Sequence, residues 1–89
     1  MIPKEGKVIV DFWAQWCGPC KMMMPVLEKY SAEDDAIEVV KINVDEEPEI
    51  ASEYGIRSIP TFMYIEDGEI VKRQTGSMTI QELKEFTKS

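Results

Sequence analysis

Two cysteines, Cys17 and Cys20, are the residues of this sequence best suited to chemistry, and the chain has no others. They stand in the segment Trp16-Cys17-Gly18-Pro19-Cys20, between a short apolar run and an expected helix. Residues three apart are neighbours in a helical turn, so the two sulfur atoms can meet in a disulfide. A disulfide that closes so short a loop adds little stability, which is typical of a redox-active pair.

Cys17 is the expected nucleophile of the pair. It lies at the N-terminus of the expected helix, where free backbone N–H groups and the helix dipole stabilise an anion and lower the pKa of a thiol. The thiolate is the form that attacks a disulfide. Cys20 lies one turn further along the helix, so we expect it to be more buried and less acidic, as suits a resolving cysteine.

Three other interpretations of the cysteine pair remain open at this point. The cysteines could be reduced core residues, a plain structural disulfide, or half of a zinc site. Structural zinc needs four ligands, and the chain has no histidine and no further cysteine, so only a dimer could complete that site. Because the Cys-x-x-Cys pair follows a strand and opens a helix, the redox interpretation is favoured and no metal site is predicted.

The elements that position the cysteines can be predicted from apolar spacing and turn residues. Short β-branched runs predict strands, apolar residues at helical spacing predict helices, and Asp67-Gly68 predicts a hairpin. Thr79 and Glu82 form a capping-box pattern before the last helix. The predicted strands span Lys7–Trp13, Ile37–Val44, Thr61–Ile65 and Ile70–Thr75, and the predicted helices span Cys17–Glu33, Pro48–Tyr54 and Thr79–Lys88.

This order, β-α-β-α-β-β-α, predicts an α/β fold with one mixed four-stranded sheet flanked by three helices. The first strand, helix and strand should form a parallel pair with a right-handed crossover. The 89 residues suffice for a single domain, which we assign to residues 1–89.

The composition excludes several classes of protein. The chain is 44% hydrophobic and 30% charged, which is ordinary for a globular domain and excludes a disordered or low-complexity segment. A net charge of −7 without a basic run argues against binding to nucleic acid or to anionic membranes. No apolar run could span a bilayer, and residues 1–6 lack the apolar stretch of a signal peptide, so we expect a cytoplasmic protein.

A longer pattern extends from about Lys7 to the C-terminus. Its parts, in order, are Val10-Asp11-Phe12-Trp13-Ala14-Gln15-Trp16-Cys17-Gly18-Pro19-Cys20-Lys21, Pro25, Lys41 within Val-Lys-Ile-Asn-Val-Asp, Tyr54-Gly55-Ile56-Arg57-Ser58-Ile59-Pro60-Thr61, Asp67-Gly68-Glu69 and Gly76. With these motifs the sequence resembles the thioredoxin family. The run Trp-Cys-Gly-Pro-Cys favours thioredoxins over glutaredoxins and disulfide isomerases, whose middle pair usually differs.

The resemblance implies a role for Asp11, which interrupts an apolar strand. In the family this position is a buried acid behind the second cysteine, which exchanges a proton as Cys20 attacks, and Lys41 would be its charged neighbour. Burial without a partner raises the pKa of a carboxyl group. The alternative is an aspartate at the end of a strand whose side chain reaches solvent.

The resemblance also implies a docking surface for target proteins. The peptide bond Ile59-Pro60 should be cis, and Ile59 should offer its backbone N–H and C=O to an extended target peptide. Trp16 should flank the cysteines and exclude water, with a plain core aromatic as the alternative. The other positions that match the family's docking surface are Gly18, Pro19, Pro60, Thr75, Gly76 and Ser77.

The function implied is that of a protein-disulfide reductase in electron transport and cell redox homeostasis. The pair Cys17–Cys20 is itself the redox group, so no bound cofactor is expected. The sequence has no dinucleotide-binding fingerprint, so a separate thioredoxin reductase would supply electrons. Two alternatives are a glutaredoxin-like protein coupled to glutathione and a binding subunit in which the cysteines are secondary.

The sequence departs from the family at its N-terminus. Thioredoxins usually begin with an extra strand and helix, for which this chain has no residues. The strand Ile37–Val44 should then form an exposed edge of the sheet, with Glu38 and Lys41 as its protection. We expect a monomer whose edge strand permits weak self-association.

Overall fold

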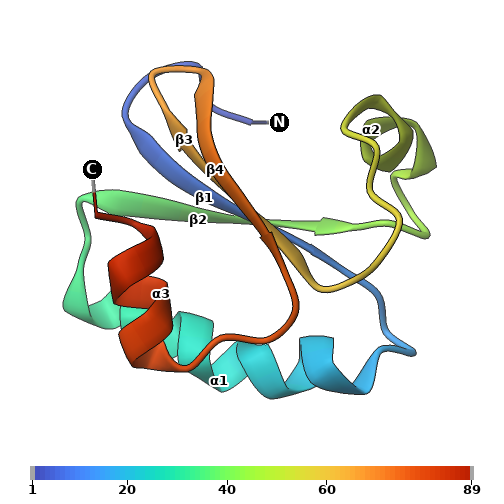
Figure 1. Cartoon of the computed structure of the whole chain (residues 1–89), viewed down its shortest axis with the longest axis horizontal. Coiled ribbons are helices and arrows are strands. Elements are labelled where there is room, and N and C mark those ends of the chain that lie inside the picture. The colour runs from blue at the N-terminus through green and yellow to red at the C-terminus, as the bar shows by residue number, and fades with distance from the viewer. Residues whose placement is uncertain (1, 89) are drawn as a thin grey trace.

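The computed structural model describes residues 2–88, and its elements follow the predicted order (Figure 1). The strands are β1 (Lys7–Trp13), β2 (Ile37–Asn43), β3 (Thr61–Glu66) and β4 (Glu69–Thr75), and the helices are α1 (Gly18–Glu33), α2 (Pro48–Glu53) and α3 (Ile80–Phe86). The predicted α/β fold with a mixed four-stranded sheet and three helices is confirmed. Cys17 and Thr79, which we predicted as the first helical residues, are the N-caps of α1 and α3.

The four strands form one sheet in the order β2-β1-β3-β4. β1 is paired on both sides, in parallel with β2 and antiparallel with β3, and β3 pairs antiparallel with β4. The parallel register places Asp11 opposite Lys41 and Trp13 opposite Asn43. Within residues 2–88, β2 pairs with β1 alone, so the prediction that it forms an edge of the sheet is confirmed.

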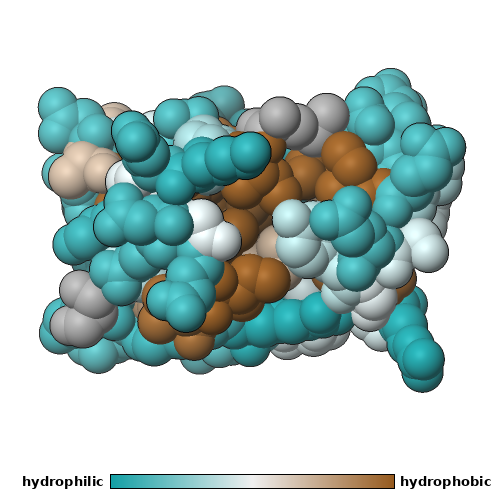
Figure 2. Space-filling model, turned by 90° about the horizontal axis from the view of Figure 1, so that it is seen from above, coloured by the Kyte–Doolittle hydropathy of each residue, from teal (hydrophilic) through white to brown (hydrophobic). Residues whose placement is uncertain are grey.

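Helices cover the two faces of the sheet unequally (Figure 1). α1 and α3 lie together on one face, over a core that includes Ile9, Leu27, Tyr64 and Leu83. The other face carries a second core, made of alternate residues of β1 with neighbours from β2 and β3, and α2 covers only part of it. Seen from this side, hydrophobic residues reach the surface in the middle of the molecule (Figure 2).

Local sequence explains where the elements begin and end. The capping box of α3 is present, because Thr79 and Glu82 each accept a hydrogen bond from the backbone N–H of the other. Asp67 and Gly68 both have positive φ, at 49° and 84°, as a tight hairpin between β3 and β4 requires. Of the helices in the described part of the chain, none is long and apolar enough to cross a membrane.

Candidate active site

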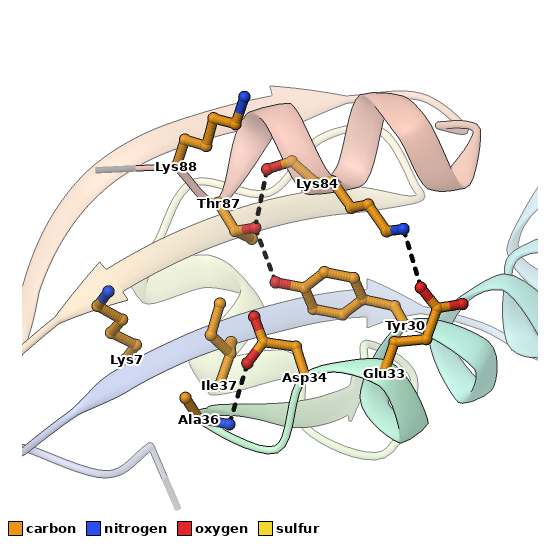
Figure 3. Close-up of a pocket in the computed structure, with 9 residues that line it drawn as sticks. All are labelled: Lys7, Tyr30, Glu33, Asp34, Ala36, Ile37, Lys84, Thr87 and Lys88. Carbon is orange, nitrogen blue, oxygen red and sulfur yellow. Dashed lines mark hydrogen bonds and ion pairs between the residues drawn. The ribbon is translucent and has the colours of Figure 1, made fainter.

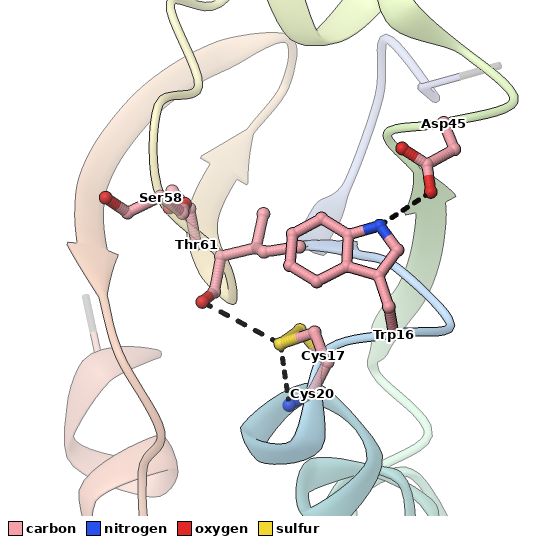
Figure 4. Close-up of a disulfide and its surroundings, with 7 residues drawn as sticks. Trp16, Cys17, Cys20, Asp45, Ser58 and Thr61 are labelled. Carbon is pink, nitrogen blue, oxygen red and sulfur yellow. Dashed lines mark hydrogen bonds between the residues drawn. A yellow bond between two sulfur atoms is a disulfide. The ribbon is translucent and has the colours of Figure 1, made fainter.

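The two cysteines lie where β1 ends and α1 begins. They form a disulfide with a Cα–Cα distance of 5.2 Å (Figure 4). The N–H of Cys17 donates to the carbonyl of Ala14 at 3.2 Å, which closes the turn between the two elements. Ala14, Cys17 and Cys20 form a small buried cluster against which Trp13 and Ile59 pack.

The surroundings of Cys17 favour negative charge on its sulfur. As the N-cap of α1, Cys17 accepts a hydrogen bond from the N–H of Cys20 to its Sγ at 3.2 Å. In the reduced protein the same N–H and the helix dipole would stabilise a thiolate at Cys17. Cys17 is 5% exposed and Cys20 is completely buried, so the cysteine expected to attack is also the one that a target sulfur can reach.

The backbone of Ile59 lies beside the cysteines. Its carbonyl oxygen is 3.8 Å from the Sγ of Cys17, close enough to accept a hydrogen bond from the reduced thiol. The Ile59-Pro60 peptide bond is cis, as predicted. Pro60 is buried, and its carbonyl accepts a hydrogen bond from the N–H of Gly76 at 2.8 Å. The structure therefore places Ile59 beside Cys17, with Pro60 next to it in sequence and Gly76 bonded to Pro60.

Trp16 lies on the surface next to the cysteines, with 70% of its area exposed, so the alternative of a core aromatic is wrong. Its indole Nε1–H donates to Oδ2 of Asp45 at 2.8 Å, which fixes the ring beside the disulfide (Figure 4). Our sequence analysis missed Asp45. The signal was present, because Asp45 follows β2, and the carboxyl ends of the parallel strands β1 and β2 meet at one edge of the sheet.

Asp11 is completely buried on the face of β1 that α1 covers, so the alternative of a solvent-exposed aspartate is wrong. Neither of its carboxylate oxygens has a hydrogen-bond partner. Burial raises the pKa of Asp11 from 3.8 to about 7, and the positive charge of Lys41 opposes part of that rise. Lys41 itself is exposed on the edge strand β2, and Gly18 and Pro19 are exposed next to Cys17.

A groove of about 550 Å³ lies at the other end of α1, away from the cysteines (Figure 3). Several of the polar side chains that line the groove are paired with one another. Tyr30 donates to Oγ1 of Thr87 at 2.7 Å, and Lys84 forms an ion pair with Glu33 at 2.8 Å. The groove contains none of the predicted site residues. Among residues 2–88, no group of three or more histidine, cysteine or acidic side chains is arranged to hold a metal ion.

Comparison with known proteins identifies the family. The family model named Thioredoxin matches residues 1–89. The thioredoxin of Bacillus subtilis is 50% identical over 83 residues, which are 92% of this chain and 80% of that protein. The thioredoxin of Rickettsia typhi is 57% identical over 70 residues, which are 78% of this chain and 67% of that protein.

The chain belongs to the thioredoxin family.

Solved thioredoxins have the same fold as this member of the family. Thioredoxin from Fasciola hepatica superposes with a TM-score of 0.88 at 38% identity, over 94% of this chain and 81% of that one. Mitochondrial thioredoxin 3 from Saccharomyces cerevisiae, in its oxidised form, gives a TM-score of 0.85 at 38% identity, over 92% of this chain and 77% of that one. Together with the Cys17–Cys20 disulfide, these relatives identify the chain as a thiol–disulfide oxidoreductase.

The raised pKa of Asp11 makes the stability of this thioredoxin-family chain depend on pH. Between pH 4 and 7 the folded protein holds a proton that the unfolded chain has released, so its free energy of unfolding falls as the pH rises. With the pKa raised from 3.8 to about 7, the fall amounts to roughly 4 kcal/mol. Asp11→Asn should remove this dependence and be more stable than the wild type at pH 8, as urea unfolding of the oxidised proteins would measure.

Asp35→Asn provides the control, because Asp35 is an exposed aspartate in a turn. Its stability should follow the pH profile of the wild type. If Asp11→Asn also follows that profile, the carboxyl group of Asp11 does not titrate in the folded protein as described. The Asp11→Asn variant should in addition turn over more slowly in disulfide reduction, with the pH dependence between pH 6 and 9 reduced.

Proposed function

We propose that the chain reduces disulfides of target proteins by dithiol–disulfide exchange through Cys17 and Cys20. The thiolate of Cys17 attacks one sulfur of the target disulfide, and that S–S bond breaks as a mixed disulfide forms. The released target thiolate takes up a proton. Cys20 then attacks the sulfur of Cys17 and releases the second target thiolate, so two electrons pass to the target and Cys17–Cys20 becomes a disulfide. The observation that carries this proposal is the position of Cys17, with the N–H of Cys20 directed at its sulfur.

Asp11 would serve as the proton acceptor for Cys20. The thiol of Cys20 must lose its proton before it attacks, and its complete burial keeps solvent bases away. Asp11 is buried beneath the same helix, and with a pKa of about 7 it is partly ionised at neutral pH. Lys41, opposite Asp11 in the register of β1 and β2, would favour the ionised form.

Target proteins would dock around Ile59. An extended segment on either side of the target disulfide can pair with the backbone N–H and C=O of Ile59, in the manner of an added strand. Gly18, Pro19 and Gly76 would form the rest of the surface, with Pro60 buried next to Ile59, and Trp16 would shield the sulfur atoms from water. The carbonyl of Ile59 lies beside the Sγ of Cys17, which supports this placement.

Electrons would come from a separate thioredoxin reductase, because the pair Cys17–Cys20 is the only redox group that the sequence provides. The chain would need no bound cofactor and would take part in electron transport that maintains cell redox homeostasis. We place it in the cytoplasm, since a dithiol that reduces other proteins has to be kept reduced by its compartment.

Replacing each cysteine in turn tests the order of attack. Cys20→Ser removes the resolving thiol, so the reduced variant should accumulate a mixed disulfide between Cys17 and insulin, visible by mass spectrometry without reductant. Cys17→Ser is the matched control and should form none. An adduct through Cys20, or no adduct with either variant, would contradict the mechanism.

The direction of electron flow can be tested by the equilibrium potential of Cys17–Cys20 in graded thiol buffers. We expect a value near the roughly −270 mV of characterised thioredoxins. A value close to the roughly −120 mV of the oxidant DsbA would contradict a reducing role, because such a pair accepts electrons from target proteins.

The edge strand β2 allows a test of oligomeric state. We propose a monomer that self-associates weakly through β2, so the average mass in sedimentation velocity should rise with protein concentration. Glu38→Val, which removes a protecting charge from this edge, should make the rise steeper, whereas Glu69→Val at an exposed position of β4 on the opposite edge should not. A wild-type mass that is independent of concentration would exclude self-association.

A further inference from the structure

Residues 54–60 connect α2 to β3 and carry Ile59 to the side of Cys17. This connection has no regular structure between Tyr54, the C-cap of α2, and Thr61, the first residue of β3. Its position relative to the cysteines therefore depends on the contacts that hold it. Each end of the connection has a polar contact with β4 or with the residue that follows it, and β4 is the outermost strand on the other side of β3.

Arg73 makes the contact at the first end. It lies in the middle of β4, opposite Met63 of β3, on a strand whose residues are all exposed. Its guanidinium donates two hydrogen bonds to successive backbone carbonyls. Nη1 donates to the carbonyl of Tyr54 at 2.5 Å, and Nη2 donates to the carbonyl of Gly55 at 2.9 Å.

These two carbonyls are well matched to a guanidinium group. They lie at the C-terminus of α2, where backbone carbonyls lack helical partners and the helix dipole is negative. α2 has no basic residue in its own last turn, so β4 supplies the missing positive charge. The planar fork of arginine can reach two adjacent acceptors at once, which the single ammonium group of lysine cannot do in the same way.

Gly76 makes the contact at the second end. It directly follows β4, and its N–H donates to the carbonyl of Pro60 at 2.8 Å. β4 and the residue that follows it thus hold both ends of the connection, and β4 is itself fixed by its pairing with β3. The Ile59 carbonyl, 3.8 Å from the Sγ of Cys17, lies between these two attachments along the chain.

We propose that Arg73 is a positioning residue that sets the place of Ile59 for docking of target proteins. It touches neither the cysteines nor the target. By holding Tyr54 and Gly55 it keeps the backbone of Ile59 where an extended peptide can pair with it, and so favours protein disulfides over small disulfides. This inference rests on the proposed docking role of Ile59.

The rates at which the protein reduces two disulfides of different size test the proposal. The reduced protein is mixed with insulin, which presents an extended segment, or with DTNB, a small aromatic disulfide that needs no backbone pairing. Arg73→Gln should react with insulin about 3- to 10-fold more slowly than the wild type, the scale expected for losing charge-assisted hydrogen bonds at an exposed site. Its rate with DTNB should stay within about two-fold of the wild type, because the cysteines themselves are unchanged.

Lys72→Gln is the matched control. It removes the same charge from the neighbouring position of β4, and the Nζ of Lys72 contacts the carbonyl of Lys88 instead of the connection. Both of its rates should match the wild type. Arg73→Lys should lie between the wild type and Arg73→Gln in its reaction with insulin, and it also provides the test if Arg73→Gln does not fold.

The proposal is overturned if Arg73→Gln and Arg73→Lys keep the wild-type ratio of the two rates, whether or not their thermal unfolding changes. It is also overturned if Lys72→Gln loses reactivity with insulin to the same extent, because charge alone would then explain the effect. Failure of the proposed function would look different, since wild-type protein would then not reduce insulin in the first place.

Discussion

β1 is paired on both of its sides, and its parallel partner β2 determines where the reactive groups lie. Parallel strands end at the same edge of a sheet, so the turn that leads from β1 to Cys17 lies next to the residues that follow β2. The N–H of Val44 donates to the carbonyl of Trp13 at 2.9 Å and ties the two ends together. From there Asp45 reaches the indole of Trp16. The crossover that makes this pairing parallel is α1, whose first turn holds both cysteines.

The same pairing places one carboxyl group in the core. Asp11 is buried opposite Lys41 of β2 and Phe62 of β3, and neither of its carboxylate oxygens has a hydrogen-bond partner. A charged group in such a place is costly, and the protein responds by holding the proton more tightly. Lys41 is near enough to moderate this effect but lies on an edge strand, where water screens its charge. Asp11 is therefore poised between its two forms at neutral pH.

Much of this arrangement could be predicted from sequence because its signals are local. The cysteine spacing, the Asp67-Gly68 hairpin and the Thr79–Glu82 capping box each depend on residues a few positions apart, and the structure contains all three. The burial of Asp11, which interrupts an apolar strand, was implied by the resemblance to the thioredoxin family. Asp45 and Arg73 were missed, since each acts across 18 to 29 positions of sequence, and no local pattern marks such a pair. The surface position of Trp16, whose indole bonds to Asp45, was left with a core aromatic as its alternative for the same reason.

The burial of Asp11 has a practical consequence because the sequence contains no histidine. In the oxidised protein the cysteines do not titrate, whereas burial raises the pKa of Asp11 to about 7, so its carboxyl group changes protonation near neutral pH. A protonated carboxyl in a dry interior has an infrared carbonyl band separate from the bands of surface carboxylates. The molecule thus contains its own spectroscopic reporter, and no label has to be added to follow one proton in the core.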